Sequence, residues 1–262
     1  MIQFSINMHK ENKLKKKLKN KQEVIGTWSS LSSSNVIDVL GRTSLDFVVI
    51  DMEHGAMSNE TVENMVRAAE ANAISPIIRV SDNDEQIILK ALETDVQSIL
   101  VPHISSADEA KRVVKYSKYF PEGERGLSPY TRVHNFSHEN LDKSLTKTNE
   151  EMFVGILVEG VTGLSNLEEI SQVKGIDLIY LGLFDICQSV GLPGEMSHPK
   201  VLNEIVKCQK IISSNGISAG AMSTDLDYIK MLRENDYKFI AYLNDAAAIK
   251  NHFTEILAIL QN

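Results

Sequence analysis

Residues 46–80 read DFVVIDMEHGAMSNETVENMVRAAEANAISPIIRV and contain one complete copy of the pattern that decides the fold. An apolar run, Asp46–Asp51, precedes a longer stretch, Asn59–Ala71, in which apolar residues return every three or four positions. A second apolar run, Pro76–Val80, follows. Short β-branched runs predict strands, and the spacing of three or four predicts a helix with one buried face. This stretch therefore predicts a strand, a helix and another strand.

The same alternation recurs about eight times between Val24 and the end of the chain, with a further helix predicted over Ala107–Tyr119. The other predicted strands are Val24–Leu31, Ser98–Pro102, Met152–Val158, Ile176–Leu181, Ile217–Ala221 and Phe239–Leu243. Apolar strands separated by helices are typical of a parallel sheet covered on both faces. A doubly wound open sheet usually needs fewer strands, so eight units favour an α/β fold of the (β/α)8 TIM-barrel type, as a single domain over residues 24–262.

Local signals refine this outline. Ser58, Ser106 and either Ser223 or Thr224 precede predicted helices, and each offers an oxygen that can cap the first turn. The segment 120–135 is rich in proline, glycine, serine and charge. It is too long for an ordinary connection, so we expect it to be functional or disordered.

The charge distribution separates a basic start from an acidic body. The chain of 262 residues has 27 Lys and Arg against 35 Asp and Glu, a net charge of −8. Residues 1–24 hold seven Lys and two Glu, a balance of +5, so the remainder carries −13. We interpret residues 1–23 as a lysine-rich N-terminal helix with a solvated face. The acidic body argues against a nucleic-acid partner.

The remaining composition indicates a cytoplasmic protein. Every apolar run is far shorter than the ~20 residues needed to cross a bilayer, so we expect no membrane segment. No apolar leader with a cleavage site follows the N-terminal lysines. Cys187 and Cys208 form no disulfide framework and suit a reducing compartment.

Polar residues follow several predicted strands at the point where each strand ends. In a barrel of this type the carboxyl ends of all strands meet at one mouth, where active sites form. The polar residues at these ends are Asp51, Glu53, His54, Arg79, Glu159 and Asp185. Two carboxylates, a guanidinium and an Asp/His pair suit a hard divalent cation, with water and substrate completing its coordination.

Each of these residues has a structural alternative. Glu159 and Asp185 could each cap the next helix, Arg79 could pair with a buried carboxylate, and His54 could be an ordinary loop residue. Other chemistries fit less well. The lysines near strands, Lys174 and Lys238, precede them, which disfavours imine chemistry at the mouth. The sequence has no phosphate-binding loop, dinucleotide fingerprint or nucleophile elbow.

Several motifs taken together resemble the HpcH/HpaI aldolases. The similarity runs from about residue 13 over nearly the whole chain. The matching stretches are Gly26–Trp28, Val49–His54, Arg79 with Asn83 and Asp84, Val101–Pro102, Pro121–Gly126 (a P-x-G-x-R-G segment), Glu159, and Gly182–Asp185 (a G-x-x-D motif). Their order and spacing are more specific than any single piece.

The resemblance implies a TIM barrel that acts as a class II pyruvate aldolase, a carbon–carbon lyase. It would split a 4-hydroxy-2-oxo acid into pyruvate and an aldehyde. The side chains of Glu159 and Asp185 would bind Mg²⁺ or Mn²⁺, or else Co²⁺ or Zn²⁺. The family is typically hexameric and exchanges its last helix between neighbours, so the resemblance also implies a homo-oligomer.

The resemblance also implies roles for three further positions. Arg79 would steady the developing enolate, and Trp28 would be an aromatic of the pocket. His54, with Asp51 beside it, would handle the proton of the substrate hydroxyl. Histidine has a reference pKa of ~6.5, and a neighbouring carboxylate can orient its ring, so this role is chemically reasonable.

Departures from the family pattern point to an unusual acceptor aldehyde or an altered reaction. Leu157 stands where many relatives have glutamine, Leu183 where they have proline, and Asp95 where glycine is usual. Leu183, Phe184 and Asp185 belong to the segment whose backbone amides would receive the pyruvate carboxylate. Tyr242–Asn244 replaces a smaller segment in the eighth strand. We expect a more apolar pocket than in the relatives.

Two other functions remain open at this point. The same enolate chemistry would serve a CoA-ester lyase or an oxaloacetate decarboxylase. Alternatively, the departures at Leu157 and Leu183 would suit a barrel that binds these ligands without catalysis.

Overall fold

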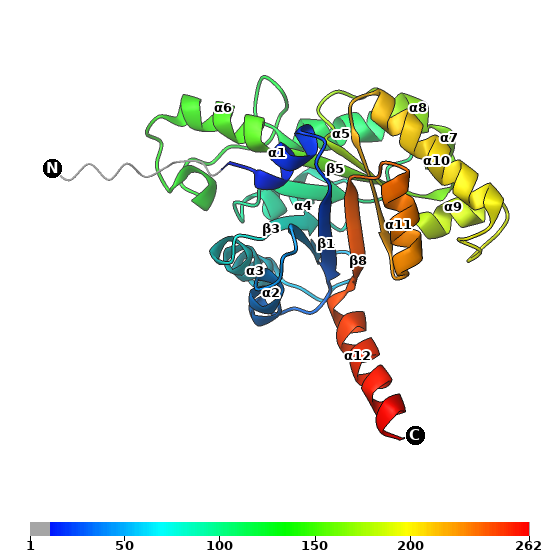
Figure 1. Ribbon diagram of the computed structural model, residues 1–262. Coiled ribbons are helices and arrows are strands. Elements are labelled where there is room, and N and C mark those ends of the chain that lie inside the picture. The colour runs from blue at the N-terminus through cyan, green and yellow to red at the C-terminus, as the bar shows by residue number, and fades with distance from the viewer. Residues whose placement is uncertain (1–10, 262) are drawn as a thin grey trace.

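The computed structural model describes residues 11–261, and its eight strands close into a parallel barrel in chain order (Figure 1). The strands are β1 (Val24–Ser29), β2 (Phe47–Asp51), β3 (Ser75–Arg79), β4 (Ser98–Val101), β5 (Phe153–Val158), β6 (Leu178–Leu181), β7 (Ser218–Ser223) and β8 (Phe239–Asn244). The barrel closes where β1 pairs with β8. The predicted (β/α)8 fold is confirmed.

Helices surround this barrel, except for one at each end of the chain (Figure 1). The helices are α1 (Lys13–Lys19), α2 (Ser34–Gly41), α3 (Asn59–Ala71), α4 (Glu85–Leu92), α5 (Ala107–Ser117), α6 (Leu141–Glu151), α7 (Gly160–Ser165), α8 (Leu167–Ile170), α9 (Leu183–Ser189), α10 (Pro199–Ser214), α11 (Leu226–Glu234) and α12 (Asp245–Leu260). A short 3-10 helix covers Arg132–His134. Within residues 11–261, none of the helices combines the length and the apolar character that crossing a membrane requires.

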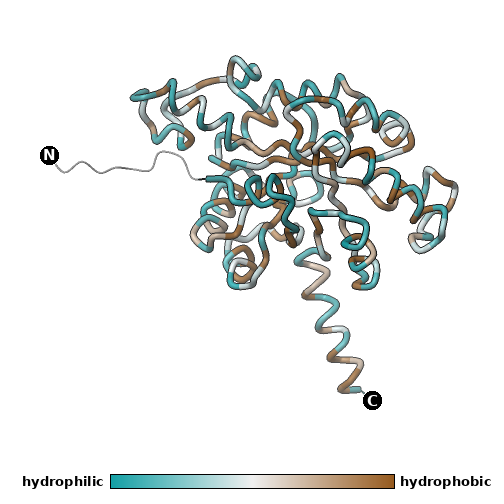
Figure 2. The backbone as a smooth tube through the Cα atoms, turned by 45° about the horizontal axis from the view of Figure 1, so that its top comes forward, coloured by the Kyte–Doolittle hydropathy of each residue, from teal (hydrophilic) through white to brown (hydrophobic). Residues whose placement is uncertain are grey.

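Each strand contributes to two apolar layers because its side chains alternate between the two faces of the sheet. In β2, Phe47 and Val49 point into the barrel, while Val48 and Ile50 pack outward against the helices. The apolar segments accordingly concentrate in the barrel wall, as Figure 2 shows. All five residues of β2 are buried, which explains the unbroken apolar run in the sequence.

Helix α1 closes the amino-terminal end of the barrel. Leu14 and Leu18 lie one turn apart on its buried face, are only 1% and 6% exposed, and belong to the inner apolar layer. Asn12 caps the helix, and its side-chain amide also donates to Gln97 O at 3.0 Å and to Ser98 Oγ at 3.1 Å. The lysines of α1 lie mostly on the solvated face, as expected. The first part of the predicted extension, residues 1–10, lies outside the described residues.

Two of the three predicted caps are confirmed. The hydroxyls of Ser58 and Ser106 accept hydrogen bonds from backbone N–H groups in the first turns of α3 and α5. The prediction for α11 is wrong, since Asp225 rather than Ser223 or Thr224 is its cap. The carboxylate of Asp225 accepts from the first turn, and Ser223 Oγ accepts instead from the backbone N–H of Asp225 at 3.1 Å.

The segment 120–135, expected to be either functional or disordered, has a defined conformation, so the alternative of disorder is wrong. Arg125 anchors the segment and is only 5% exposed. Its guanidinium carbon lies 4.6 Å from the ring centre of Tyr119, and its Nη2 lies 3.2 Å from Glu93 Oε1. Burial raises the pKa of Tyr119 to about 12, so this tyrosine stays neutral. These contacts explain how a segment rich in turn-forming residues keeps one conformation.

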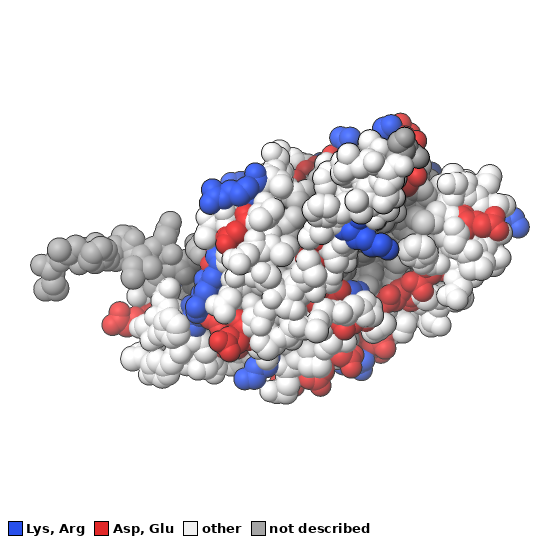
Figure 3. Space-filling view, turned by 90° about the horizontal axis from the view of Figure 1, so that it is seen from below, with Lys and Arg blue, Asp and Glu red and all other residues white. Residues whose placement is uncertain are grey.

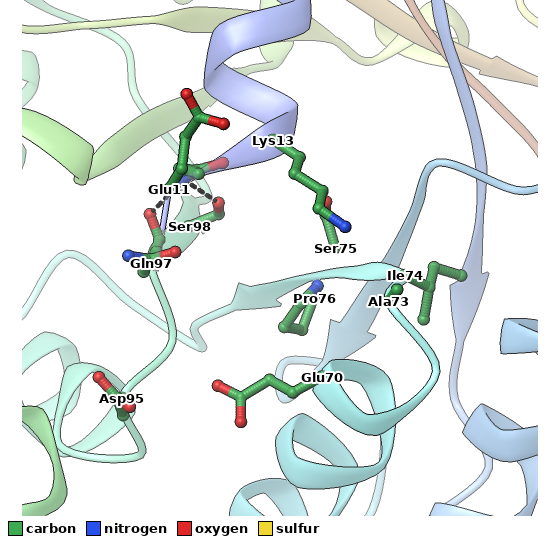
Figure 4. A pocket seen from close by; sticks show the side chains of 11 residues that line it. Glu11, Lys13, Glu70, Ala73, Ile74, Ser75, Pro76, Asp95, Gln97 and Ser98 are labelled. Carbon is green, nitrogen blue, oxygen red and sulfur yellow. Dashed lines mark hydrogen bonds between the residues drawn. The ribbon is translucent and has the colours of Figure 1, made fainter. Parts of the chain in front are cut away.

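A cavity of about 380 Å³ lies beside α1, at the amino-terminal ends of β3 and β4 (Figure 4). Glu70, Ser75, Asp95 and Gln97 are among the residues that line it. Active sites of such barrels form at the carboxyl ends of the strands, which is the opposite end. The cavity therefore lies away from the predicted chemistry.

We expect Leu14→Ala and Leu18→Ala each to lower the free energy of unfolding by about 2–5 kcal/mol, because each removes buried volume and leaves a cavity. Urea denaturation measures this change. The exposed Lys19→Ala, in the same helix, is the control and should stay within about 0.5 kcal/mol of the wild type. Leucine variants as stable as this control would show that α1 does not close the barrel in solution.

Candidate active site

The carboxyl ends of neighbouring strands bring the predicted polar residues to one mouth. Asp51 ends β2, Arg79 ends β3, and the strand register places these two residues opposite each other. Glu159 directly follows β5, and Gly182 follows β6. Figure 3 looks onto the side of the molecule from which α12 projects, and acidic side chains are distributed over it.

Arg79 is held at this mouth by two carboxylates. Its Nε and Nη2 donate to the two oxygens of Asp51 at 2.9 and 2.6 Å. Its Nη1 lies 2.8 Å from Glu53 Oε2, an ion pair without good hydrogen-bond alignment. The three side chains are nearly buried, so water screens these charges little. The structural alternative for Arg79, as partner of a buried carboxylate, is therefore present, and this pairing leaves its predicted role toward the enolate open.

Trp28 supports Arg79 from inside the barrel. The ring centre of Trp28 lies 4.5 Å from the guanidinium carbon, within the range of a cation–π contact. The indole Nε1 donates to Tyr180 Oη at 3.1 Å. Burial raises the pKa of Tyr180, so it remains a neutral phenol. Trp28 thus touches the predicted enolate-stabilising group directly.

Glu159 and Asp185 converge on the same small space. A Cβ atom on Gly182 would lie 2.5 Å from Asp185 Oδ2 and 3.4 Å from Glu159 Cβ, so a side chain there would force the Asp185 carboxylate to move. Glu159 is the N-cap residue of α7 but makes no side-chain capping hydrogen bond, and Asp185 lies within the first turn of α9, whose N-cap is Gly182. Burial raises the pKa of Glu159, and the negative charges of Glu53 and Asp185 add to this effect.

His54 is placed differently from the expected Asp51/His54 pair. Asp51 Oδ1 accepts from the backbone N–H groups of Glu53 at 3.0 Å and of His54 at 3.2 Å. The side chain of His54 is exposed and makes no hydrogen bond within residues 11–261. Asp51 therefore shapes the turn that carries His54, instead of orienting its imidazole ring.

Two residues without a predicted role belong to this mouth, Glu53 and His103. His103 Nε2 lies 2.9 Å from Glu53 Oε1, and His103 Nδ1 lies 2.9 Å from Glu159 Oε1. The histidine thus bridges the carboxylates that follow β2 and β5. Glu53 stood among the strand-end residues, and the same rule applied to the fourth strand would have found His103 directly after Pro102.

The apolar residues that depart from the family pattern, Leu157 and Leu183, lie in different layers of the fold. Leu157 points into the barrel and is buried. The side chain of Leu183 is buried in the outer layer, between strands and helices, so only its backbone N–H is available to a ligand. Phe184 is 65% exposed at the start of α9. Leu157 thus lies in the barrel interior and Phe184 at the rim, while the expectation of a more apolar pocket stays a prediction.

The residues of the mouth fit a hard divalent cation. Glu159 and Asp185 supply carboxylate oxygens, the ligands that Mg²⁺ and Mn²⁺ prefer. Burial is the main cause of the raised pKa of Glu159, and the negative charges of Glu53 and Asp185, which a bound cation would offset, contribute to it. Among the described residues, no group of three or more His, Cys, Asp or Glu side chains is arranged as a metal site. A cation here would therefore need water or substrate oxygens as additional ligands.

The chain is thus an eight-stranded parallel barrel with two carboxylates and a paired arginine at the carboxyl ends of its strands. The family model for the HpcH/HpaI aldolase/citrate lyase family matches residues 24–251. The chain belongs to this family, which is a family of carbon–carbon lyases.

Individual relatives agree with this placement. A hydroxypyruvate/pyruvate aldolase of Roseobacter denitrificans is 31% identical over 247 residues, covering 94% of this chain and 96% of the relative. The crystal structure of the citrate synthase SbnG is 30% identical with a TM-score of 0.84, covering 95% of this chain and 97% of the other. An HpcH/HpaI aldolase from Desulfitobacterium hafniense has a TM-score of 0.89 at 24% identity, covering 95% and 96% of the two chains, and shares the fold.

We expect Mn²⁺ to raise the melting temperature at neutral pH but not near pH 4.5. Without a cation, the raised pKa of Glu159 means that the folded state holds the proton more tightly than the unfolded chain. The contribution of Glu159 to the free energy of unfolding is therefore fully present below about pH 4.5. It is lost as the pH rises through the raised pKa of Glu159 in the folded state. Mn²⁺ binds only the ionised carboxylate, so its stabilising effect should appear over that same rise.

Differential scanning fluorimetry measures this effect. At a Mn²⁺ concentration of about 100 times Kd, the shift near pH 7.5 should be about 5–10 °C. Glu159→Gln should remove the shift, and the exposed Glu168→Gln should keep it. An equal shift in wild type and Glu159→Gln would contradict this placement of the cation.

Proposed function

We propose that this chain catalyses the reversible cleavage of a 4-hydroxy-2-oxo acid into pyruvate and an aldehyde, with a divalent cation, Mg²⁺ or Mn²⁺, at Glu159 and Asp185. The observation that carries the proposal is the fixed guanidinium of Arg79 at the same mouth as these two carboxylates. Relatives named as aldolases of hydroxypyruvate, pyruvate and keto-deoxy acids support the substrate class.

Breaking the bond between C3 and C4 leaves negative charge on the 2-oxo oxygen. Arg79 cannot turn away, because Asp51 and Glu53 hold three of its nitrogens. It is therefore preorganised to stabilise this charge, an effect worth several kcal/mol in comparable sites. When bound, the cation would supply further positive charge beside the same oxygen. The backbone N–H groups of Leu183 and Phe184, in the first turn of α9, would orient the substrate carboxylate.

Cleavage also requires removal of the proton from the 4-hydroxyl group. We assign the removal of this proton to the imidazole of His54. This side chain is exposed on the turn that Asp51 holds through two hydrogen bonds from the backbone. Asp51 would act by fixing this turn. Phe184, exposed at the rim, would contact the aldehyde portion.

We expect Glu159→Ala and Asp185→Ala each to lower turnover by at least about 100-fold, because the developing charge would lose the cation. Pyruvate release, followed by a coupled lactate dehydrogenase reaction over a panel of 4-hydroxy-2-oxo acids, measures turnover. Glu168→Ala on α8 is the matched control. Turnover that survives both substitutions and a chelator would show that the assignment is wrong.

A second candidate is favoured by the similarity to the citrate synthase SbnG at 30% identity over 95% of this chain. The same mouth would then generate an enolate from a CoA thioester or decarboxylate oxaloacetate. Incubation with oxaloacetate, with and without acetyl-CoA and Mg²⁺, separates these reactions. Release of free thiol would favour the CoA branch, and binding of pyruvate without any product would indicate a non-catalytic barrel.

We propose that the protein is a homo-oligomer, a hexamer, in which α12 packs on a neighbouring copy. This helix projects away from its own barrel (Figure 1). Apolar side chains recur on it at helical spacing and are 39–75% exposed: Ile249, Phe253, Ile256, Leu257 and Leu260. An apolar face of this kind in water favours association. A neighbouring α12 would also cover the open mouth.

Replacing both Phe253 and Leu257 by Asp should therefore yield a smaller assembly without unfolding the barrel, because these side chains do not pack on it. Light scattering after size-exclusion chromatography measures the mass. Asn251→Asp with Thr254→Asp adds the same charge on α12 and should leave the mass unchanged. A monomeric wild type, or an unchanged mass in the apolar pair, would contradict the proposal.

We also propose a cytoplasmic location. Cys187 and Cys208 are buried free thiols, as suits a reducing compartment. Burial raises the pKa of Cys208 to about 12, so this thiol is unreactive near neutral pH.

A further inference from the structure

His103 occupies a position at the mouth that its backbone geometry selects. It follows β4 and Pro102 with φ of +59°, in the left-handed region that side-chain-bearing residues seldom adopt. This turn places the imidazole between the carboxylates that follow β2 and β5, although its side chain is 61% exposed. Histidine is one of the residue types that tolerate this conformation, and here it sets the direction of the ring toward both carboxylates.

The contacts of His103 with Glu159 are made by one oxygen only. Glu159 Oε1 accepts from the backbone N–H of His103 at 3.1 Å and lies 2.9 Å from the ring Nδ1. No hydrogen bond to Glu159 Oε2 is present in the described part of the chain. The side chain of Glu159 is therefore clamped by Oε1, and its second oxygen is free for a ligand.

The other ring nitrogen connects this clamp to the guanidinium. His103 Nε2 lies 2.9 Å from Glu53 Oε1, and Glu53 Oε2 lies 2.8 Å from Arg79 Nη1. An unbroken series of contacts thus runs from Arg79 through Glu53 and His103 to Glu159. The group that stabilises the enolate and the carboxylate that holds the cation are fixed relative to each other.

We infer that His103 is a positioning residue for the cation site, which holds Glu159 so that Oε2 faces the ligand together with Asp185. This inference rests on the proposed function, since it takes Glu159 and Asp185 as the cation ligands. Partners that orient a metal-binding side chain typically change metal affinity by about 10- to 100-fold when they are removed. His103 should therefore act on affinity for the cation even when no substrate is present.

Mn²⁺ binding to the full-length protein, measured by isothermal titration calorimetry without substrate, tests the inference. His103→Gly removes the ring and adopts a positive φ without strain, so it should fold and bind Mn²⁺ about 10- to 100-fold more weakly. His103→Asn also tolerates this backbone, and its side-chain N–H₂ can replace Nδ1 toward Glu159. The asparagine variant should recover most of the lost affinity, although it cannot reach Glu53.

The control is His138→Ala, which removes an exposed histidine far along the chain that contacts Tyr130 instead of a carboxylate. It should bind Mn²⁺ like the wild type. Circular dichroism establishes that each variant is folded. If His103→Gly fails to fold, the comparison of His103→Asn with His103→Gln decides, because only asparagine keeps a donor at the position of Nδ1.

The possible results distinguish the role of His103 from the existence of the cation site. Suppose that the wild type binds Mn²⁺ and that Asp185→Ala abolishes this binding. If His103→Gly then binds Mn²⁺ as tightly as the wild type or more tightly, only the role of His103 is overturned. Tighter binding would mean that the imidazole competes with the cation. Absence of Mn²⁺ binding by the wild type overturns the cation site and the role of His103 together.

Discussion

The buried pairing of Arg79 with Asp51 and Glu53 is the interaction on which the mouth of this barrel depends. A guanidinium with little exposure is stable only if carboxylates surround it, and removal of one partner from such a pair commonly costs about 3–5 kcal/mol. Here the partners come from the neighbouring strand β2 and the turn after it, because parallel pairing sets Asp51 directly opposite Arg79 and Glu53 follows two residues later. Asp51 also accepts hydrogen bonds from backbone N–H groups of the following turn. One carboxylate therefore holds both the guanidinium of Arg79 and the turn that carries His54.

Closure of the barrel then brings the second half of the site to the first. Glu159 follows β5 and Asp185 lies in the first turn after β6, a long way along the chain from Asp51. Their approach depends on Gly182, since a side chain there would occupy the space of the Asp185 carboxylate. The result is one region that combines a fixed positive group with two carboxylates, which we propose as ligands for a cation. Enolate chemistry requires both, because the charge that develops must be stabilised where the carbon–carbon bond breaks.

Much of this could be predicted from sequence because strand ends in a parallel barrel share one mouth. The strands, the class of fold and the convergence of Arg79 with Glu159 and Asp185 follow from periodicity and that rule. The hydrogen-bond partners of Asp51 could not be predicted, because the order of residues in Asp51–His54 does not show whether the carboxylate faces the imidazole or the backbone. The sequence also did not show whether the side chain of Leu183 points into the barrel or outward toward the helices. The strand-end rule, applied to the fourth strand, places His103 at the mouth, but the direction of its ring depends on a positive φ that the sequence Val101–Pro102–His103 does not indicate.

The most direct test of the central claim is the anomalous diffraction of Mn²⁺ in crystals soaked with pyruvate. We expect one strong peak at the mouth, about 2.0–2.6 Å from carboxylate oxygens of both Glu159 and Asp185, with Arg79 still paired to Asp51. A peak elsewhere, or Glu159 and Asp185 turned apart with no density between them, would contradict the claim that one cation joins these two side chains.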